Sequence, residues 1–247
     1  MTNLQWCPFS IDRALRATFL LGFAWTLIGG CLLSGAAAQS FSQTTNFHWD
    51  GTLAQGKILE IRGIYGSIRA IPSTNGSIQV DARIHNPAVS RVDVVPSGSG
   101  ITICSVASTP NGNENECQPE HRTASAESNS QVDFVIHVPA GVRFSASMIY
   151  GDITVNSLQS DVNVATIDGN IELNESRDQG AEFYGNTVNG SIDSDFPIYD
   201  SAPSLPEGSP VDSHRPRIVR ARIGDGGPAL DASSVSGTIR LRTMVEQ

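Results

Sequence analysis

A short phrase centred on glycine recurs six times in this sequence and constrains its fold more than any other feature. Lined up on the glycine, the copies read GIYGSI, STNGSI, MIYGDI, TIDGNI, TVNGSI and SVSGTI. Isoleucine follows every one of these glycines two residues later, and Ile or Val stands two residues before five of them. The pairs are Gly66 and Ile68, Gly76 and Ile78, Gly151 and Ile153, Gly169 and Ile171, Gly190 and Ile192, and Gly237 and Ile239.

The residues after each glycine alternate between apolar and polar, as in Gly151-Asp-Ile-Thr-Val and Gly169-Asn-Ile-Glu-Leu. A period of two predicts a strand that is buried on one side. Another short alternation, Asp161-Val-Asn-Val, lies between Gly151 and Gly169. Each repeat is therefore expected to hold two short strands.

Two arrangements of these strands agree with the local sequence. Asp-Gly and Asn-Gly pairs can close tight hairpins, which would give an antiparallel meander. The glycine spacings of 18 residues (Gly151 to Gly169) and 21 residues (Gly169 to Gly190) instead match one coil of a stacked repeat, which we favour. In such a stack the glycine turns a corner, Ile171 belongs to an internal ladder, and Asn170 points outward, so that Asn170→Ser should have almost no effect on stability.

Three segments interrupt the repeat. Residues 91–104 read as a hairpin around a Pro-Ser-Gly turn, and residues 105–130 read as a polar loop before a strand at 132–138. Residues 196–217 contain five prolines and lie within the 47-residue gap between Gly190 and Gly237. Proline cannot donate a backbone hydrogen bond to a neighbouring strand, so this segment is expected to be an excursion.

The stretches VDFVIHVPAGVRFSASMIYGDITV, SDVNVATIDGNIEL, TVNGSI and GDGGPALDASSVSGTIRL together resemble the bacterial β-strand-repeat family called "putative adhesin". The resemblance runs from about Gly56 to Leu241. Its most specific parts are VPAG at 138–141 and the Gly226-Gly227 pair before Gly237. The resemblance implies an all-β, right-handed parallel β-helix-like solenoid exported to the cell envelope. It implies no catalytic residues.

Residues 1–38 have the layout of a signal peptide. Arg13 and Arg16 precede an apolar run, and Ala36-Ala37-Ala38 offers a cleavage site before Gln39. We therefore expect residues 39–247 to form a single exported domain in the periplasm, at the cell surface or in the medium. Two alternatives stay open: the uncharged stretch is long enough to be retained as a membrane anchor, and Cys31 could be the lipidated residue of a lipoprotein.

Charge limits the partners of the expected mature chain. It keeps 14 of the 16 basic and 24 of the 25 acidic residues, so its formal charge is −10. A surface of this sign repels the phosphates of nucleic acids and anionic membranes. We expect no nucleic-acid partner, and membrane contact only if the leader is retained.

Two cysteines, Cys104 and Cys117, remain after the leader. In an exported chain the simplest interpretation is a disulfide between them. Closing a loop of this length stabilises a fold by about 3 kcal/mol in the chain-entropy treatment. A redox or metal pair is the alternative, but the spacing fits neither a C-x-x-C motif nor a zinc site.

No arrangement of residues in the sequence indicates catalysis or metal binding. The candidate carboxylates occupy unequal positions of the repeat, where solvated turn and strand residues are the ordinary interpretation; they are Asp152, Asp161, Asp168, Asp193 and Asp195. The histidines have no spacing typical of ligands; they are His48, His85, His121, His137 and His214. We predict no catalytic, cofactor-binding or metal-binding residue, and no cofactor.

Two surface features could serve contacts. Tyr65 and Tyr150 precede equivalent glycines and could line up, and four arginines fall within eight residues: Arg215, Arg217, Arg220 and Arg222. Arginine and tyrosine are typical of interfaces, although the arginines could simply offset nearby carboxylates. The sequence favours a non-catalytic envelope scaffold that contacts proteins or glycans. The alternative is a carbohydrate-active enzyme, similar to a polysaccharide lyase or hydrolase, on the same scaffold.

Overall fold

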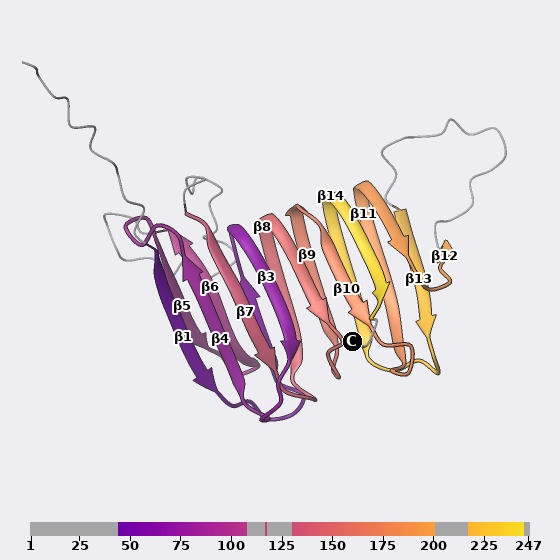
Figure 1. Cartoon of the computed structure of the whole chain (residues 1–247), viewed down its shortest axis with the longest axis horizontal. Coiled ribbons are helices and arrows are strands. Elements are labelled where there is room, and N and C mark those ends of the chain that lie inside the picture. Colours follow the sequence, from indigo (N-terminus) through magenta and orange to yellow (C-terminus); the bar gives the residue numbers. More distant parts are fainter. Residues whose placement is uncertain (1–43, 108–116, 118–129, 201–216, 245–247) are drawn as a thin grey trace, which may run out of the picture. The chain divides into compact units, whose positions relative to one another are not determined.

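The alternating segments form strands, so the all-β part of the prediction is confirmed (Figure 1). The computed structural model describes residues 44–107, 117, 130–200 and 217–244. The proposed leader at 1–38 lies outside these residues, as do most of the 105–130 loop and most of the proline-rich 196–217 segment. Within the described part there is no helix, and hence none suited to crossing a membrane. The strands are β1 (Thr45–Gly51), β2 (Ile58–Arg62), β3 (Tyr65–Pro72), β4 (Ile78–Ile84), β5 (Ser90–Pro96), β6 (Gly100–Ala107), β7 (Val132–Val138), β8 (Arg143–Asn156), β9 (Val162–Asp168), β10 (Ile171–Glu175), β11 (Ala181–Ser194), β12 (Tyr199–Asp200), β13 (Arg217–Ile223) and β14 (Ala229–Thr243).

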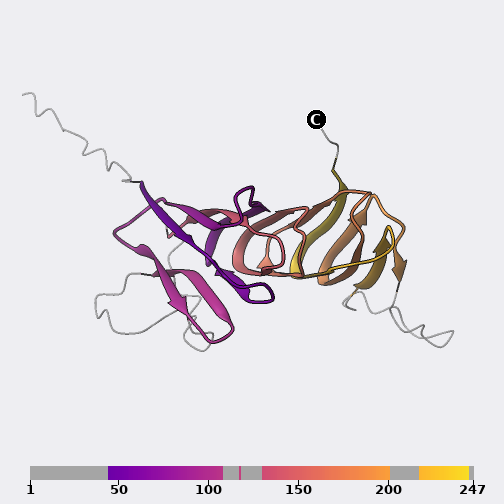
Figure 2. The ribbon, with the colours of Figure 1, turned by 90° about the horizontal axis from the view of Figure 1, so that it is seen from below.

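The strands make two faces that enclose the core between them (Figure 2). The β9 face runs in the order β5, β6, β2, β8, β9, β14, β11, β13, β12. The β10 face runs in the order β1, β4, β7, β3, β8, β10, β14, β11. The long strands β8, β11 and β14 contribute their first halves to the β9 face and their second halves to the β10 face.

Strands on either side of a repeated glycine do not pair with each other. β9 ends just before Gly169 and β10 begins just after it, yet each pairs in parallel with β8 on one side and β14 on the other. A hairpin at Asp168-Gly169 would instead have paired β9 with β10 in antiparallel fashion. The meander is therefore excluded, and Gly169 carries the chain from one face to the other.

The spatial order of the repeats differs from their order in the sequence. β14 comes last in the chain but lies between β9 and β11 on one face and between β10 and β11 on the other. After β11 the chain forms β12 and β13, and β13 pairs antiparallel with the far edge of β11. β14 then pairs in parallel with the edge of β11 that faces β9 and β10. The spacing of 21 residues from Gly169 to Gly190 consequently does not join neighbouring rungs, because Gly237 lies between them.

Five glycines stack into a column at the corner between the faces, in the order Gly66, Gly151, Gly169, Gly237, Gly190. At each of them a Cβ atom would lie 1.8–2.0 Å from a backbone carbonyl oxygen of the preceding rung. For example, the oxygen of Gly66 occupies the position that a side chain at Gly151 would need, and Gly151 also has φ +148°. Glycine is required because the backbone of the preceding rung occupies the space that a side chain would need.

Gly76 and Ile78 differ from the other repeat pairs. Gly76 lies with φ +73° in the turn between β3 and β4, and a Cβ there would meet nothing within 4 Å. Ile78 begins β4, which pairs antiparallel with β1 and β7. The phrase STNGSI is thus a true turn, in which glycine serves a positive φ, whereas the corner glycines make room for the backbone of a neighbouring strand.

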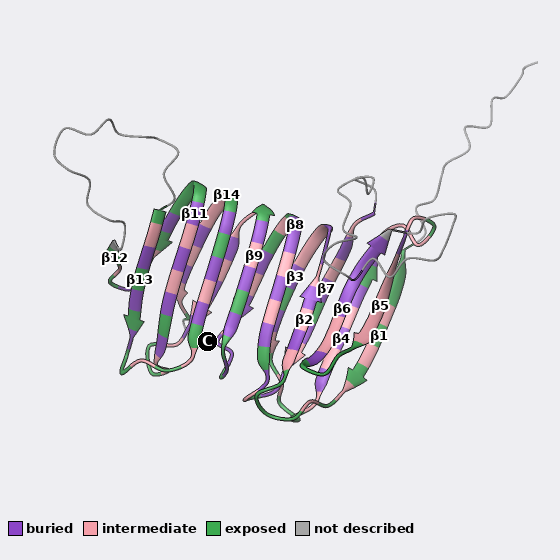
Figure 3. Ribbon diagram, turned by 180° about the vertical axis from the view of Figure 1, so that it is seen from behind, coloured by how far each residue is buried: buried purple, intermediate pink, exposed green. Residues whose placement is uncertain are grey.

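The inward-facing side chains form continuous ladders (Figure 3). On the β10 face the isoleucines two residues after the stacked glycines are in register and buried: Ile68, Ile153, Ile171, Ile239 and Ile192. On the β9 face a matching ladder consists of Leu59, Phe144, Val162, Leu230 and Phe183. The two ladders meet in one hydrophobic core, and strand alternation leaves polar side chains outside.

Candidate contact surfaces

The two tyrosines that precede equivalent glycines stack on each other. The ring centroids of Tyr65 and Tyr150 are 4.9 Å apart, with an interplanar angle of 11°. Beneath them Ile64 and Ile149 form a small buried cluster with Tyr65. The pair therefore covers part of the corner beside β3 and β8, and Tyr150 keeps an exposed edge.

The arginines lie elsewhere, on β13 of the β9 face. Arg220 lies over the ring of Tyr184 at 5.6 Å from its centroid, and Arg222 lies 3.5 Å from the carboxylate of Glu182. Arg217 is exposed at the start of the strand, and Arg215 lies outside the described residues. Because three rungs separate β13 from β8, the structure does not bring the arginines and the tyrosine stack together.

Asp152 and Asn170 join neighbouring rungs immediately after the glycine column. The Asp152 Oδ1 accepts hydrogen bonds from the Asn170 backbone N–H at 2.7 Å and from its side-chain amide at 3.2 Å. The Asn170 Oδ1 in turn accepts from the Thr238 N–H at 3.1 Å. Asn170 therefore joins two strands at the corner, because its amide oxygen satisfies the Thr238 N–H, a contact that the sequence did not predict.

Asp193 and Asp195 bind a single arginine. The Arg242 guanidinium donates to the Asp193 Oδ2 at 2.6 Å and to the Asp195 Oδ1 at 3.0 Å. A backbone hydrogen bond from Thr243, followed by the bond from Arg242, lowers the pKa of Asp195. These carboxylates hold the ends of β11 and β14 together and are not arranged for proton transfer.

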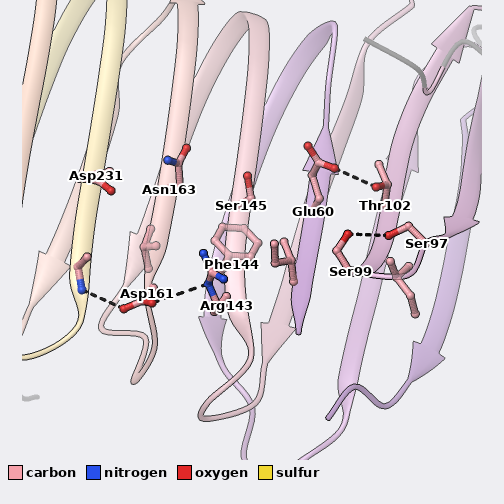
Figure 4. A pocket seen from close by; sticks show the side chains of 14 residues that line it. Glu60, Ser97, Ser99, Thr102, Arg143, Phe144, Ser145, Asp161, Asn163 and Asp231 are labelled. Carbon is pink, nitrogen blue, oxygen red and sulfur yellow. Dashed lines mark hydrogen bonds and ion pairs between the residues drawn. The ribbon is translucent and has the colours of Figure 1, made fainter. Parts of the chain in front are cut away.

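A groove crosses the β9 face over β6, β2, β8, β9 and β14 (Figure 4). Its volume is about 410 Å³. At its lower rim the carboxylate of Asp161 accepts a hydrogen bond from the Ala229 N–H at 3.1 Å and lies 3.7 Å from the Arg143 Nε. At its far end Glu60 accepts from the Arg62 guanidinium at 2.8 Å and from the Thr102 hydroxyl at 2.9 Å.

Outward-facing residues in register across the strands form what we term the polar row. Its members are Thr102, Glu60, Ser145, Asn163, Asp231, Tyr184, Arg220 and Tyr199. Figure 4 shows Glu60, Ser145, Asn163 and Asp231 following one another from strand to strand. A second hollow of about 290 Å³ shares Asn163 and Asp231 with the groove and extends it to Tyr184. The row therefore continues past the groove to the cation–π pair of Tyr184 and Arg220.

Sequence reasoning identified Arg220 but missed the rest of the polar row. Each other member occupies an ordinary polar position in an alternating strand, and the strands that carry them come from distant parts of the chain. Part of the polar row could have been found by aligning the strands that precede the repeated glycines. Matching Val162-Asn163-Val164 with Leu230-Asp231-Ala232, for example, places Asn163 opposite Asp231. Asp168, another candidate, lies exposed at the corner opposite Tyr150 and Ser236.

Two of the three described histidines, His48 and His85, pair with carboxylates near the β1–β4–β7 end, and the third, His137, lies on β7. His48 lies 2.6 Å from Asp81 and 2.7 Å from Asp50, and these hydrogen bonds, from Asp81 first, raise the pKa of His48. His85 lies 2.7 Å from Asp133. His121 and His214 lie outside the described residues. Among the described residues, no three His, Cys, Asp or Glu side chains gather as a metal site would require.

The predicted disulfide between Cys104 and Cys117 is confirmed. Both residues are buried, with Cα atoms 5.7 Å apart, a separation within the ordinary range for disulfides. The guanidinium of Arg62 donates to the carbonyl oxygen of Cys117. This covalent link fits a chain that folds in an oxidising compartment.

Comparison with known proteins gives matches among solved structures. No family model and no curated protein matches the chain. It is similar to a "putative cell adhesion protein" from Clostridium sporogenes, with a TM-score of 0.46 and 8% identity, covering 81% of this chain and 100% of that one. It is also similar to a "putative adhesin" from Bacteroides fragilis, with a TM-score of 0.28 and 11% identity, covering 82% and 99% of the two chains. Solved structures similar to this chain thus carry the description of the family that the sequence resembles.

Proposed function

We propose that the mature chain is a non-catalytic scaffold of the cell envelope that binds glycans along the polar row of its β9 face. In this proposal the rungs form a right-handed parallel β-helix-like solenoid. The solenoid holds the outward side chains at fixed positions. The observation that carries the proposal is the register of eight such side chains on eight strands, five of which line a groove of about 410 Å³.

The chemistry of the row suits a hydroxyl-rich ligand. Carboxylates accept hydrogen bonds, an amide both donates and accepts, and the serine and threonine hydroxyls do either. Tyr184 adds an apolar ring face on which the carbon skeleton of a sugar can pack. Adjacent members are separated by about 4.8 Å, the spacing of neighbouring strands, so an extended chain can make repeated contacts.

The negative charge of the groove restricts the class of glycan that it can bind. Glu60, Asp161 and Asp231 line the groove, and Arg143 is the cationic side chain among its lining residues. The mature chain has a formal charge of −10. Anionic polysaccharides would be repelled by this surface, so neutral or amino-substituted glycans are favoured.

A glycan array with residues 39–247 tests this proposal. We expect binding to neutral or amino-substituted oligosaccharides, weakened about tenfold or more when Asn163 and Asp231 are both changed to alanine, because two polar contacts are lost. The control combines Thr154→Ala on β8 and Arg240→Ala on β14, which alter outward residues of the β10 face. Absence of binding to any glycan, or equal binding by both variants, would contradict the proposal; capture of a protein through the same row would favour a protein ligand instead.

A carbohydrate-active enzyme is the second candidate, because three acidic side chains line one groove. Glu60 and Asp231 are three strand spacings apart, about 14 Å, which exceeds the separation of paired carboxylates in glycosidases. Asp161 and Asp231 are closer, since they lie on neighbouring strands two residues out of register. Asp161, however, already binds the Ala229 N–H and faces Arg143. Both contacts tie the Asp161 carboxylate to the protein itself, which leaves it poorly placed to act on a bound sugar.

Turnover assays separate the two candidates. The scaffold proposal expects no new reducing ends or unsaturated products from any glycan that the array identifies. Product formation that disappears in Asp161→Asn and Asp231→Asn would replace the scaffold proposal with the enzyme.

Export is part of the proposal and rests on the layout of residues 1–38 and on the disulfide. N-terminal sequencing of the protein from an expressing bacterium should find Gln39 first. A retained leader would favour a membrane anchor, and an acylated Cys31 would favour a lipoprotein.

A further inference from the structure

A small pocket lies away from the polar row, among the segments that connect the rungs. It is lined by Leu158 and Gln159 after β8, Gln179, Gly180 and Ala181 at the start of β11, Pro228 and Leu230 at the start of β14, and Glu175 at the end of β10. Its volume is about 190 Å³, and it is partly open to solvent. Leu158, Ala181, Pro228 and Leu230 make most of its wall apolar.

Glu175 is the unusual member of this wall. It follows Ile171 and Leu173 at inward-facing positions of β10, and only 2% of its surface is exposed. Its Oε1 accepts no hydrogen bond from any described residue. Thr243 lies opposite Glu175 in the β10–β14 register, and its Oγ1 is likewise buried without a partner among the described residues. The unpaired Oε1 of Glu175 thus lies in the wall of an apolar pocket, and the unpaired Oγ1 of Thr243 belongs to the neighbouring strand, outside the residues that line the pocket.

The buried carboxylate of Glu175 determines which chemical group a ligand of this pocket would have to supply. Burial raises the pKa of Glu175 to about 7, against which a hydrogen bond from Ser157 acts only partly. A buried carboxylate is stabilised by a positively charged partner that also donates hydrogen bonds. A calcium or magnesium ion would need several more oxygen ligands than one carboxylate and one hydroxyl. The pocket is also smaller than typical sites for drug-sized ligands.

We propose that this pocket binds a primary ammonium group on a short aliphatic stem, with Glu175 as its counter-ion. The ammonium donates to the Glu175 Oε1, and the stem packs against Leu158, Ala181 and Leu230. A free alkylamine and the side chain of a lysine in a partner peptide share this chemistry.

The proposal makes binding depend on pH in a defined direction. The ligand binds as a cation and needs Glu175 ionised, so lowering the pH through 7 protonates the site and weakens binding. For a carboxyl that titrates near 7, the apparent dissociation constant rises about tenfold between pH 8 and pH 6. A neutral ligand of equal size would show no such loss.

NMR titration of residues 39–247 at pH 8 and pH 6 tests the site with n-butylamine, N-acetyl-lysine amide and n-butanol. We expect saturable shifts at Leu158, Ala181 and Leu230 with the amines, about tenfold weaker binding at pH 6, and markedly weaker binding of butanol. If n-butylamine binds and the lysine derivative does not, the source is a free amine; the reverse favours a lysine side chain.

Glu175→Gln keeps the shape of the side chain and should abolish both the binding of amines and its pH dependence. The matched control is Glu172→Gln, on the same strand but facing outward, which should bind like the unmodified protein. Absence of saturable amine binding at pH 8, or butanol binding as tightly as butylamine, would overturn the proposal. So would unchanged amine binding in a folded Glu175→Gln variant; if that variant does not fold, the pH profile and the butanol comparison decide.

Discussion

Ile167 and Ile171 stand symmetrically about Gly169 in the sequence, but they lie in opposite environments. Ile171 is fully buried in the ladder of the β10 face, whereas 51% of the surface of Ile167 is exposed. The same holds around Gly237, where Ile239 is buried and Val235 is exposed, and around Gly190, where Ile192 is buried and Val188 is exposed. At these three corners the residue two positions after the glycine belongs to the core, and the residue two positions before it lies at the surface.

The corner explains this asymmetry. Gly169 carries the chain from the β9 face to the β10 face, so the alternation of inward and outward side chains does not continue through it. Thr166 and Ile171 both face inward although they are five residues apart. Where the tyrosine stack covers the corner, Ile64 and Ile149 are buried too. The residue two positions before the glycine is thus buried only where another side chain, here the tyrosine stack, covers the corner.

Among truncations, the largest effect should follow from shortening the isoleucine ladder at Ile239. Ile239→Ala removes a fully buried side chain between Ile171 and Ile192, so the free energy of unfolding should fall by about 2–5 kcal/mol. Val235→Ala on the same strand is the control and should change stability by less than about 0.5 kcal/mol. Urea denaturation measures both, and equal losses would show that β14 does not have the described orientation.

The glycine column offers the next test of the corner. Gly151→Ala places a Cβ 1.9 Å from the oxygen of Gly66 and should cost about 3 kcal/mol or more. Gly76→Ala has open space but a positive φ, so about 1 kcal/mol is expected. Gly98→Ala has open space and no such backbone constraint, so it should be silent. Thermal melts that rank these variants in another order would contradict the close approach of backbones at the corner.

Glu175, an ionisable side chain at an inward position, should make the free energy of unfolding depend on pH. Glu175 has a folded pKa of about 7, above its usual 4.5, so the folded protein keeps a proton that the unfolded chain has released. The stability that this group contributes is full below about pH 4.5, declines as the pH rises towards 7, and is lost above it. Relative to Glu175→Gln, the unmodified protein should lose about 3 kcal/mol between pH 4.5 and pH 8. A constant difference in urea denaturation across that range would show that Glu175 is solvated.

An outward residue that joins two rungs should have an intermediate effect. Asn170→Ser shortens a side chain that links Asp152 to the Thr238 N–H, so a loss of about 1 kcal/mol is expected. Exchange of the Thr238 amide hydrogen should become faster in this variant. Unchanged stability and exchange would show that Asn170 is only a solvated corner residue.

Local sequence was enough to identify the strands of the glycine repeat but not their neighbours. Alternation around Gly151 and Gly169 marks each strand because side-chain direction has a period of two. The placement of β14 between β10 and β11 depends on pairing between residues far apart in the chain, which no local pattern records. The spacing from Gly169 to Gly190 was therefore misleading as a coil length.

The candidate sites show the same limit. The disulfide followed from counting cysteines, whereas the polar row required knowing which strands are adjacent. Glu175 looks in the sequence like a surface residue at the end of Asn170-Ile-Glu-Leu-Asn-Glu. Only the structure places it inward, in the position that isoleucine and leucine occupy earlier in the strand.

The central claim is that the chain turns its side chains over at the glycine corner, and one matched pair of substitutions tests it. Ile171→Asp buries a charge without a partner and should leave the domain largely unfolded at 25 °C. Ile167→Asp adds a charge to an exposed position and should shift the free energy of unfolding, measured by urea denaturation, by less than about 0.5 kcal/mol. Comparable losses in the two variants, or a greater loss for Ile167→Asp, would contradict the assignment of the two faces.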